Sequence, residues 1–226
     1  MTSQSLLYQW VSADSLLIKL GAPDSPLASV HAGTLVEALI DAAPNWLADA
    51  SSGFGKALVV IRPGTEQALV ERAIQQVLAD LAVSNGVETA PIVVPVCYHR
   101  SVAPDLDAVA ERCGLDPDEV IERHCSTVLS VLAIGFAPGF GYLGAIDERL
   151  RLPRRATPRT RVARGSVAIA EAQSVIYPIE TPGGWHLIGQ SPVQLIHYRP
   201  HPDTLFAVGR TVCFEPISLA QLQVLR

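Results

Sequence analysis

Three segments in the second half of the 226-residue chain carry residue types that suit the binding of a small ligand. Residues 135–144 combine four glycines, one proline and three aromatic residues, and residues 149–164 contain seven arginines and no acid. Residues 181–189 join paired glycines to Trp185. Glycine lets a ligand approach the backbone closely, and the planar guanidinium of arginine pairs with carboxylate or phosphate. The three segments therefore favour a binding surface for a group of negative charge.

Each segment also has a structural explanation. A glycine-rich turn is often a tight connection between two strands, Trp185 could be a core residue beside a hairpin turn, and an arginine-rich loop could be a solvated surface. The lack of lysine in the arginine segment favours recognition, because arginine binds anions through a rigid fork of donors. From the residues alone, both interpretations stay open.

Catalysis by this chain alone is not indicated. The sequence contains no phosphate-binding P-loop, no nucleophile elbow and no HExxH zinc motif, and its six histidines include no pair that a helix could hold four residues apart. We therefore expect no metal site and no cofactor bound by this chain. His124 is the one candidate for proton transfer, although a histidine near the end of a helix equally fits a structural role.

Composition limits the partners. The formal net charge is −5, so the overall balance argues against a nucleic-acid-binding protein. No apolar run approaches the roughly 18 residues that a membrane helix needs, and the first residues show no export signal, so we expect a cytoplasmic protein without a membrane segment. The four cysteines show no C-x-x-C spacing and are expected to be free thiols.

The first half of the chain has the pattern of an α/β domain. Apolar runs at residues 15–20, 57–61 and 92–98 predict strands. Helices are expected between them, one starting at a capping box formed by Thr34 and Glu37 and one capped by Thr65. The resulting β-α-β-α-β order suggests a ferredoxin-like domain with its helices on one face of the sheet. Two further short helices are expected between Asp105 and His124.

From residue 127 onward the helical periodicity is lost, and short apolar runs alternate with glycine and proline turns. Closely spaced short strands of this kind predict a closed or nearly closed β-barrel. The expected strands are 127–134, 166–170, 174–179, 185–188, 193–198, 205–208 and 211–214. The sequence thus predicts an α+β protein with a ferredoxin-like α/β domain over residues 1–125 and a β-barrel domain over residues 126–226.

A series of short motifs lies in order between residues 92 and 217. They are Val94–Tyr98, Asp105–Leu106, Glu119–Ile121, His124, Ile134–Leu143, Pro153–Arg155, Pro158–Arg159, Gly165–Ala170, Gln173, Ile176–Pro178 and Pro182–Trp185. This series resembles the B subunit of bacterial 5-oxoprolinase, a family also described as KipI-type histidine-kinase inhibitors or allophanate hydrolase subunit 1. Related domains are fused in urea carboxylases. Some stretches depart from the family pattern: Gln190 stands where an arginine is usual, Arg210 where an acid is usual and Ser174 where a threonine is common, and residues 48–61 also differ.

The resemblance implies a cyclophilin-like β-barrel, a label for the fold that carries no prolyl isomerase activity with it. It also implies two partners, a KipA-type subunit that is homologous to this barrel and a LamB/YcsF-type subunit. Together the three would convert 5-oxo-L-proline to L-glutamate with consumption of ATP by the complex, and this chain is expected to be inactive alone.

On this hypothesis the barrel loops bind a small cyclic amide, and His124 is the candidate for proton transfer. The expected substrate-binding residues are Phe136, Pro138, Gly139, Phe140, Arg154, Arg155, Arg159, Gln173, Tyr177, Gly183, Gly184 and Trp185. The arginines would supply positive charge, the glycines close backbone approach, and Tyr177 with Trp185 an apolar wall.

Two other functions are consistent with the same family. The chain could be an inhibitor that docks on a sensor histidine kinase through an exposed apolar patch of Phe136, Phe140 and Tyr142. It could also belong to a urea- or allophanate-processing hydrolase.

Overall fold

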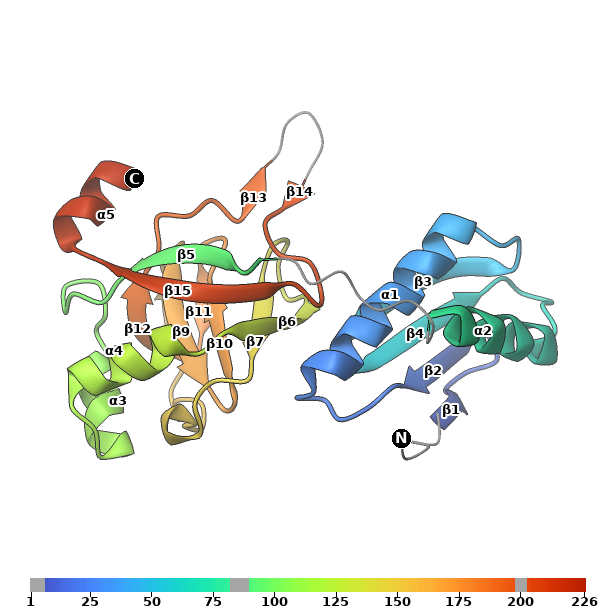
Figure 1. The fold of residues 1–226 in the computed structure, drawn as a ribbon, viewed down its shortest axis with the longest axis horizontal. Helices are drawn as coiled ribbons and strands as arrows, with labels where there is room; N and C mark the ends of the chain where they lie inside the picture. The colour runs from blue at the N-terminus through green and yellow to red at the C-terminus, as the bar shows by residue number, and fades with distance from the viewer. Residues whose placement is uncertain (1–6, 82–89, 198–202) are drawn as a thin grey trace. The chain divides into compact units, whose positions relative to one another are not determined.

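The computed structural model describes residues 7–81, 90–197 and 203–226 (Figure 1). The chain divides into two compact units, Met1–Thr89 and Ala90–Arg226, and each is described by itself. Over the described ranges, no helix combines the length and the apolar character required to cross a bilayer.

The first unit is an antiparallel sheet covered by two helices. Its strands have the order β1-β2-β4-β3. The elements are β1 (Leu7–Trp10), β2 (Ser15–Lys19), α1 (Pro26–Ala42), β3 (Leu47–Gly53), β4 (Lys56–Ile61) and α2 (Gln67–Leu81). Alternate residues of β2 and β4 are buried, which is the period-two pattern of a sheet with one face on the core. Inward residues such as Leu16 and Val59 share one core cluster with Leu35 of α1 and Ile74 of α2.

The predicted ferredoxin-like arrangement is not confirmed. The described elements of this unit run β-β-α-β-β-α, whereas the sequence predicts β-α-β-α-β. The strands at 15–20 and 57–61 are confirmed as β2 and β4. The expected third strand, residues 92–98, is confirmed as β5 (Ile92–Cys97), but it pairs with strands of the second unit and not with those of the first. β3 escaped prediction because its sequence, LADASSG, lacks β-branched and alternating apolar residues.

Both predicted helix caps in this unit were wrong. α1 begins two turns earlier than expected, because the Ser25 hydroxyl accepts a hydrogen bond from the backbone N–H of Ala28 and Pro26 occupies the first turn. Thr34 lies inside the helix, where its hydroxyl donates to the Val30 carbonyl at 3.0 Å. The Thr65 hydroxyl likewise donates to the carbonyl of Arg62 instead of capping α2.

The second unit contains a closed seven-stranded barrel, as predicted. The strand order is β6-β15-β5-β12-β9-β10-β7, and a further β6–β7 pairing closes the ring. β15 and β5 pair in parallel, and the other described pairs are antiparallel. The strands are β5, β6 (Leu129–Ile134), β7 (Gly141–Gly144), β9 (Ser166–Ala170), β10 (Gln173–Ile176), β12 (His186–Gln190) and β15 (Thr211–Ile217). Fully buried residues such as Leu129, Ile169 and Ile188 form its core.

The remaining elements of this unit surround the barrel. They are α3 (Leu106–Cys113), α4 (Pro117–Ser126), the 3-10 helix η1 (Glu148–Leu150), a ribbon of β8 (Arg159–Val162) with β11 (Thr181–Gly183), a ribbon of β13 (Ile196–His197) with β14 (Asp203–Thr204), and α5 (Leu219–Leu225). The two helices expected after Asp105 are confirmed. Gly114 ends α3 with φ 63°, and Asp116 and Glu119 form the capping box of α4.

Three expectations about this half differ from the structure. Residues 205–208 are not a strand, since their apolar character reflects Phe206, which is buried in the barrel core. Of the expected strand at 193–198, only Ile196 and His197 are in β13, and Tyr198 lies outside the described residues. The division between units at residues 89 and 90 also differs from the expected boundary at 125 and 126, because β5, α3 and α4 fall in the barrel unit.

Candidate functional site

The barrel unit carries a pocket of about 230 Å³ to which all three sequence segments contribute. Its lining residues are Phe136, Phe140, Tyr142, Arg154, Arg155, Pro158, Tyr177, Pro182, Gly183, Gly184 and Trp185. The first three come from the β6–β7 connection and β7, the next three from the chain between η1 and β8, and the last five from the chain that leads through β11 to β12.

Aromatic rings form one wall of this pocket. The Phe140 ring centroid lies 5.1 Å from that of Tyr142 and 5.4 Å from that of Tyr177, both in edge-to-face geometry. Trp185 lies 6.2 Å from Tyr142. Burial raises the pKa of Tyr177 to about 12, with the neighbouring Tyr142 adding to the shift. The Tyr177 hydroxyl therefore keeps its proton at neutral pH and can serve as a hydrogen-bond donor, not as a base.

Gly183 and Gly184 bring backbone to the other side of the pocket. A Cβ atom at Gly183 would overlap the Tyr177 hydroxyl and lie 2.9 Å from its Cζ, so only glycine fits there. Gly184 is less crowded, and its carbonyl accepts a hydrogen bond of 2.8 Å from the backbone N–H of Arg155. These contacts hold the arginine segment against the turn that follows β11.

Phe136 stands at the rim of the pocket in an unusual conformation. Its φ of 70° is left-handed, and the residue is 65% exposed. A non-glycine residue in this region stores strain on the order of 1–2 kcal/mol, a feature that often marks functional loops. The expected apolar docking patch is not present as such, because Phe140 is buried and Tyr142 is half-buried, which leaves Phe136 as the exposed member of the three.

Arg154 and Arg155 bring positive charge to the pocket. The Arg154 guanidinium lies 5.6 Å from the centroid of the Trp185 ring and 3.4 Å from the Glu171 carboxylate. Its side chain is more than half exposed, so that ion pair is screened by solvent. Arg155 instead reaches inward to Asp105.

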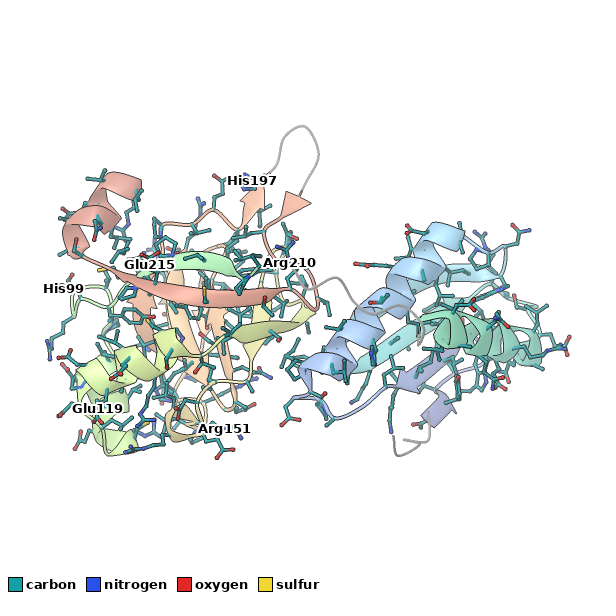
Figure 2. The ribbon with its side chains drawn as sticks, in the orientation of Figure 1. His99, Glu119, Arg151, His197, Arg210 and Glu215 are labelled. Carbon is teal, nitrogen blue, oxygen red and sulfur yellow. The ribbon has the colours of Figure 1, made fainter. Side chains whose placement is uncertain are left out.

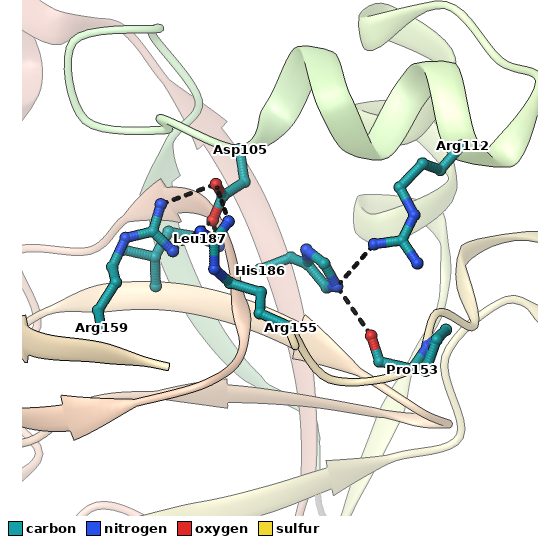
Figure 3. A network of polar contacts seen from close by, with 7 residues as sticks. All are labelled: Asp105, Arg112, Pro153, Arg155, Arg159, His186 and Leu187. Carbon is teal, nitrogen blue, oxygen red and sulfur yellow. Dashed lines mark hydrogen bonds and ion pairs between the residues drawn. The ribbon is translucent and has the colours of Figure 1, made fainter. Parts of the chain in front are cut away.

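Asp105 is the centre of a polar network behind the pocket (Figure 3). Its carboxylate accepts from Arg155 at 3.0 Å, from Arg159 at 2.7 and 2.8 Å, and from the backbone N–H of Leu187 at 2.7 Å. Burial alone would raise the pKa of Asp105, but the Arg159 and Leu187 hydrogen bonds and the charges of both arginines outweigh it, so the pKa is lowered. Asp105 is therefore an ionised, almost fully buried carboxylate.

His186 borders the same network. His186 is buried, and its Nε2 lies 2.9 Å from the Pro153 carbonyl oxygen and 3.4 Å from Nη1 of Arg112 (Figure 3). The short contact to a carbonyl oxygen requires a proton on Nε2, which makes the imidazole a donor there. His186 thus fixes the start of the arginine segment to β12.

His124 lies in the barrel core and does not line the pocket. Its Nδ1 is 2.7 Å from the Tyr98 hydroxyl, its Nε2 is 2.9 Å from the Ser174 hydroxyl, and its ring stacks on Phe214 at 4.4 Å. Burial lowers the pKa of His124 to about 3. The histidine is therefore neutral at neutral pH, and its position fits the structural interpretation that the sequence left open.

The other predicted site residues fall outside the lining. The Arg159 guanidinium donates to the Asp105 carboxylate. Gln173 is the strand partner of Ala170 where β10 pairs with β9, and Pro138 and Gly139 lie in the turn before Phe140. The left-handed φ of 73° at Gly139 shapes that turn.

Four contributors to the site escaped prediction: Asp105 and three lining residues, Tyr142, Pro158 and Pro182. All three lining residues adjoin or lie within segments already singled out, so adjacency was the available signal. An aspartate directly before a helix usually caps that helix, so the local sequence around Asp105 indicates a cap and not a residue of the site.

The departures at Gln190 and Arg210 lie away from the pocket lining. The Gln190 side chain donates to the Arg164 carbonyl and contacts Arg226. Arg210 lies just before β15, and Arg151 is on the exposed loop after η1 (Figure 2).

Among the residues that the structure describes, no three His, Cys, Asp or Glu side chains cluster as metal ligands would. The donors that face the pocket suit an anion.

Comparison with known proteins defines the class. The model of the carboxyltransferase domain, subdomain C and D, matches residues 6–206. Crystal structures of the protein TTHA0988 include one that superposes with a TM-score of 0.79 at 33% identity, covering 90% of this chain and 40% of that one. The chain belongs to this family of carboxyltransferase domains.

Curated relatives narrow the family. The 5-oxoprolinase B subunit of Bacillus subtilis (strain 168) is 42% identical over 149 residues, which are 66% of this chain and 62% of that protein. The 5-oxoprolinase B subunit of Escherichia coli O157:H7 is 34% identical over 208 residues, which are 91% of this chain and 94% of that protein. The aligned part thus spans less than two thirds of the Bacillus protein and nearly all of the Escherichia protein. Within the larger family, the chain is a member of the group of 5-oxoprolinase B subunits.

Proposed function

We propose that this chain is a non-autonomous subunit of an ATP-dependent 5-oxoprolinase and that its barrel pocket binds 5-oxo-L-proline or an intermediate derived from it. The observation that carries the proposal is the pocket, in which an aromatic wall, two arginines and paired glycines face one small volume. The names of the curated relatives supply the reaction.

The pocket suits a small ring acid in size and chemistry. Its volume of about 230 Å³ lies below the roughly 300–1,000 Å³ of sites for drug-sized ligands. A five-membered lactam ring fits against the faces of Tyr142 and Trp185, and its carboxylate fits the guanidinium groups of Arg154 and Arg155. The Tyr177 hydroxyl, which keeps its proton, is a donor for the ring carbonyl.

The same lining supports a need for partner subunits. None of the lining residues is a serine, cysteine, histidine, aspartate or glutamate, and the tyrosines keep their protons. The pocket can therefore bind and orient a ring acid, while the nucleophile, the base and the ATP site come from the KipA-type and LamB/YcsF-type partners. His124 could take part in proton transfer only after a rearrangement of the core that now encloses it.

The test is ATP-dependent hydrolysis of 5-oxo-L-proline by a complex reconstituted from this chain and its KipA-type and LamB/YcsF-type partners. Activity should require this chain, and full activity without it would overturn the proposal. Urea and allophanate as alternative substrates, and autophosphorylation of a cognate sensor kinase with and without the chain, examine the other functions of the family in the same preparation.

A substitution in the pocket sharpens the assay. Arg154→Gln should raise KM for 5-oxo-L-proline about tenfold, since a charge-assisted hydrogen bond contributes about 1.5–3 kcal/mol and this side chain is partly screened. Arg161→Gln is the matched control, because Arg161 is also exposed and paired with an acid, Glu180, but lies outside the pocket lining. Equal KM values for the two variants would contradict the assigned role of Arg154.

A further inference from the structure

Asp105 occupies the N-cap position of α3 but does not cap the helix. An aspartate at this position usually accepts a hydrogen bond from a backbone N–H in the first helical turn. Here the side chain makes no capping hydrogen bond. It turns toward the barrel, where all of its described partners lie in the arginine segment or on β12. Its placement therefore serves the wall of the pocket and not the helix.

The contacts of Asp105 are too specific for a general surface ion pair. Both oxygens are engaged, by two guanidinium groups and one backbone N–H, and the side chain is only 6% exposed. The backbone also participates, since the N–H of Asp105 donates to the Leu187 carbonyl at 3.0 Å. One buried negative charge between Arg155 and Arg159 leaves one positive charge of this cluster uncompensated.

Arg155 is the member of the cluster that reaches the pocket. Nη1 is held by Asp105, and the backbone N–H is held by the Gly184 carbonyl. Within the described part of the chain, its buried Nε has no hydrogen-bond partner. A buried donor without an acceptor is costly, so the guanidinium of Arg155 has donor capacity that its described neighbours do not use.

We propose that Asp105 is a positioning residue of the pocket: it holds Arg155 so that its free guanidinium donors meet the carboxylate of a singly charged ring acid. The inference rests on the proposed function for the identity of the ligand. It assigns Asp105 no contact with substrate. The uncompensated positive charge matches one carboxylate, which makes the pocket selective for a monoanion over its uncharged analogue.

Asp105→Asn tests this inference in the reconstituted complex. The amide keeps the size of the side chain and an acceptor for the Leu187 N–H but removes the charge that orients Arg155. Two quantities are measured: KM for 5-oxo-L-proline and the inhibition constant of its uncharged carboxamide as a competitive inhibitor. We expect KM to rise at least tenfold and the inhibition constant to change less than threefold.

Asp147→Asn is the matched control. Asp147 also pairs with a half-buried arginine, Arg123 at 3.1 Å, and lies outside the pocket lining. It should leave the selectivity for acid over carboxamide unchanged. An unchanged KM for Asp105→Asn, or an equal loss for both ring compounds, would overturn the inference, because the second result is that of a merely structural residue.

Arg155→Lys keeps the test decisive if Asp105→Asn does not fold. Lysine can still pair with Asp105 but lacks the Nε donor and the fixed fork. The same selective loss for the acid is expected, and an unchanged preference for acid over carboxamide would refute the inference. If the reconstituted complex keeps its full 5-oxoprolinase activity when this chain is left out, the proposed function fails instead. The two failures are therefore distinguishable.

Discussion

Replacing His124 with glutamine should remove a defined part of the pH dependence of folding. Glutamine can still accept from Tyr98 and donate to Ser174, but it does not titrate. In the wild type, burial lowers the pKa of His124 to about 3, whereas an unfolded chain has a histidine pKa near 6.5. The unfolded chain takes up the proton first, so stability is lost as pH falls from about 6.5 toward 3.

The magnitude follows from the two pKa values. At a given pH, His124 lowers the free energy of unfolding by RT times the logarithm of a ratio. The numerator is the proton-binding partition function of the histidine in the unfolded chain, and the denominator is that of the histidine in the folded chain. Between pH 7 and pH 5 the free energy of unfolding falls by about 2 kcal/mol. Below pH 5, each further drop of one pH unit lowers it by about 1.4 kcal/mol until the pH reaches the folded pKa. Loss of the stack on Phe214 lowers the stability of the variant at every pH, but it does not change this slope.

The assay is urea unfolding of the wild type and of the His124→Gln variant, each at pH 7 and at pH 5. Trp185 is the only tryptophan in the barrel unit, so Trp10→Phe and Trp46→Phe in both chains make fluorescence report on that unit. The free energy of unfolding should fall between the two pH values by about 2 kcal/mol more in the wild type than in the variant. The titrating carboxylates are common to both chains and cancel in this comparison.

Equal pH dependence of the two proteins would refute the reasoning. It would mean that His124 is accessible to protons in the folded barrel, and its place as a candidate for proton transfer would then be strengthened. A larger fall in the variant would show that the histidine is charged in the fold, contrary to its burial and its neutral hydrogen-bond partners.

Two further predictions concern the pocket turn and a helix cap. Gly183→Ala should destabilise the barrel unit by about 1–3 kcal/mol and weaken ligand binding, because its Cβ would overlap the Tyr177 hydroxyl; Gly184→Ala, whose Cβ would lie 3.7 Å from its nearest neighbour, is the control in thermal unfolding. Asp116→Ala should cost about 1 kcal/mol through loss of the α4 capping box, and a urea midpoint no lower than that of Asp118→Ala, a change in the same first turn, would contradict it.

Local pattern predicted the elements that carry strong local signals. The period-two strands β2 and β4, the helices α3 and α4, and a succession of short strands closing into a barrel were anticipated, although β7 was not among the expected strands. The failures have local causes too. The polar strand β3 has no apolar alternation, and a helix start at Ser25 and Pro26 competed successfully with the apparent capping box at Thr34.

Strand partners could not be predicted from local pattern. β5 has the apolar character of any buried strand, and nothing in its own residues states that it pairs with β12 and with β15, which lie far along the chain. Such pairings depend on which apolar faces the whole chain can bury together. The predicted boundary at 125 and 126 therefore differs from the division at 89 and 90, and β5, α3 and α4 lie in the second unit.

Composition alone identified the three segments that form the pocket, because glycine, arginine and aromatic residues have chemistry that is independent of the fold. The fold decided which of them face the ligand. It placed Arg154 and Arg155 on the pocket wall, moved Arg159 behind them, and enclosed His124 in the core, where desolvation keeps it neutral. It also made Asp105 a buried carboxylate whose partner Leu187 is 82 residues away. Charges and hydrogen bonds between distant segments exist only after the chain has closed its barrel, and this is why the tertiary structure alone reveals them.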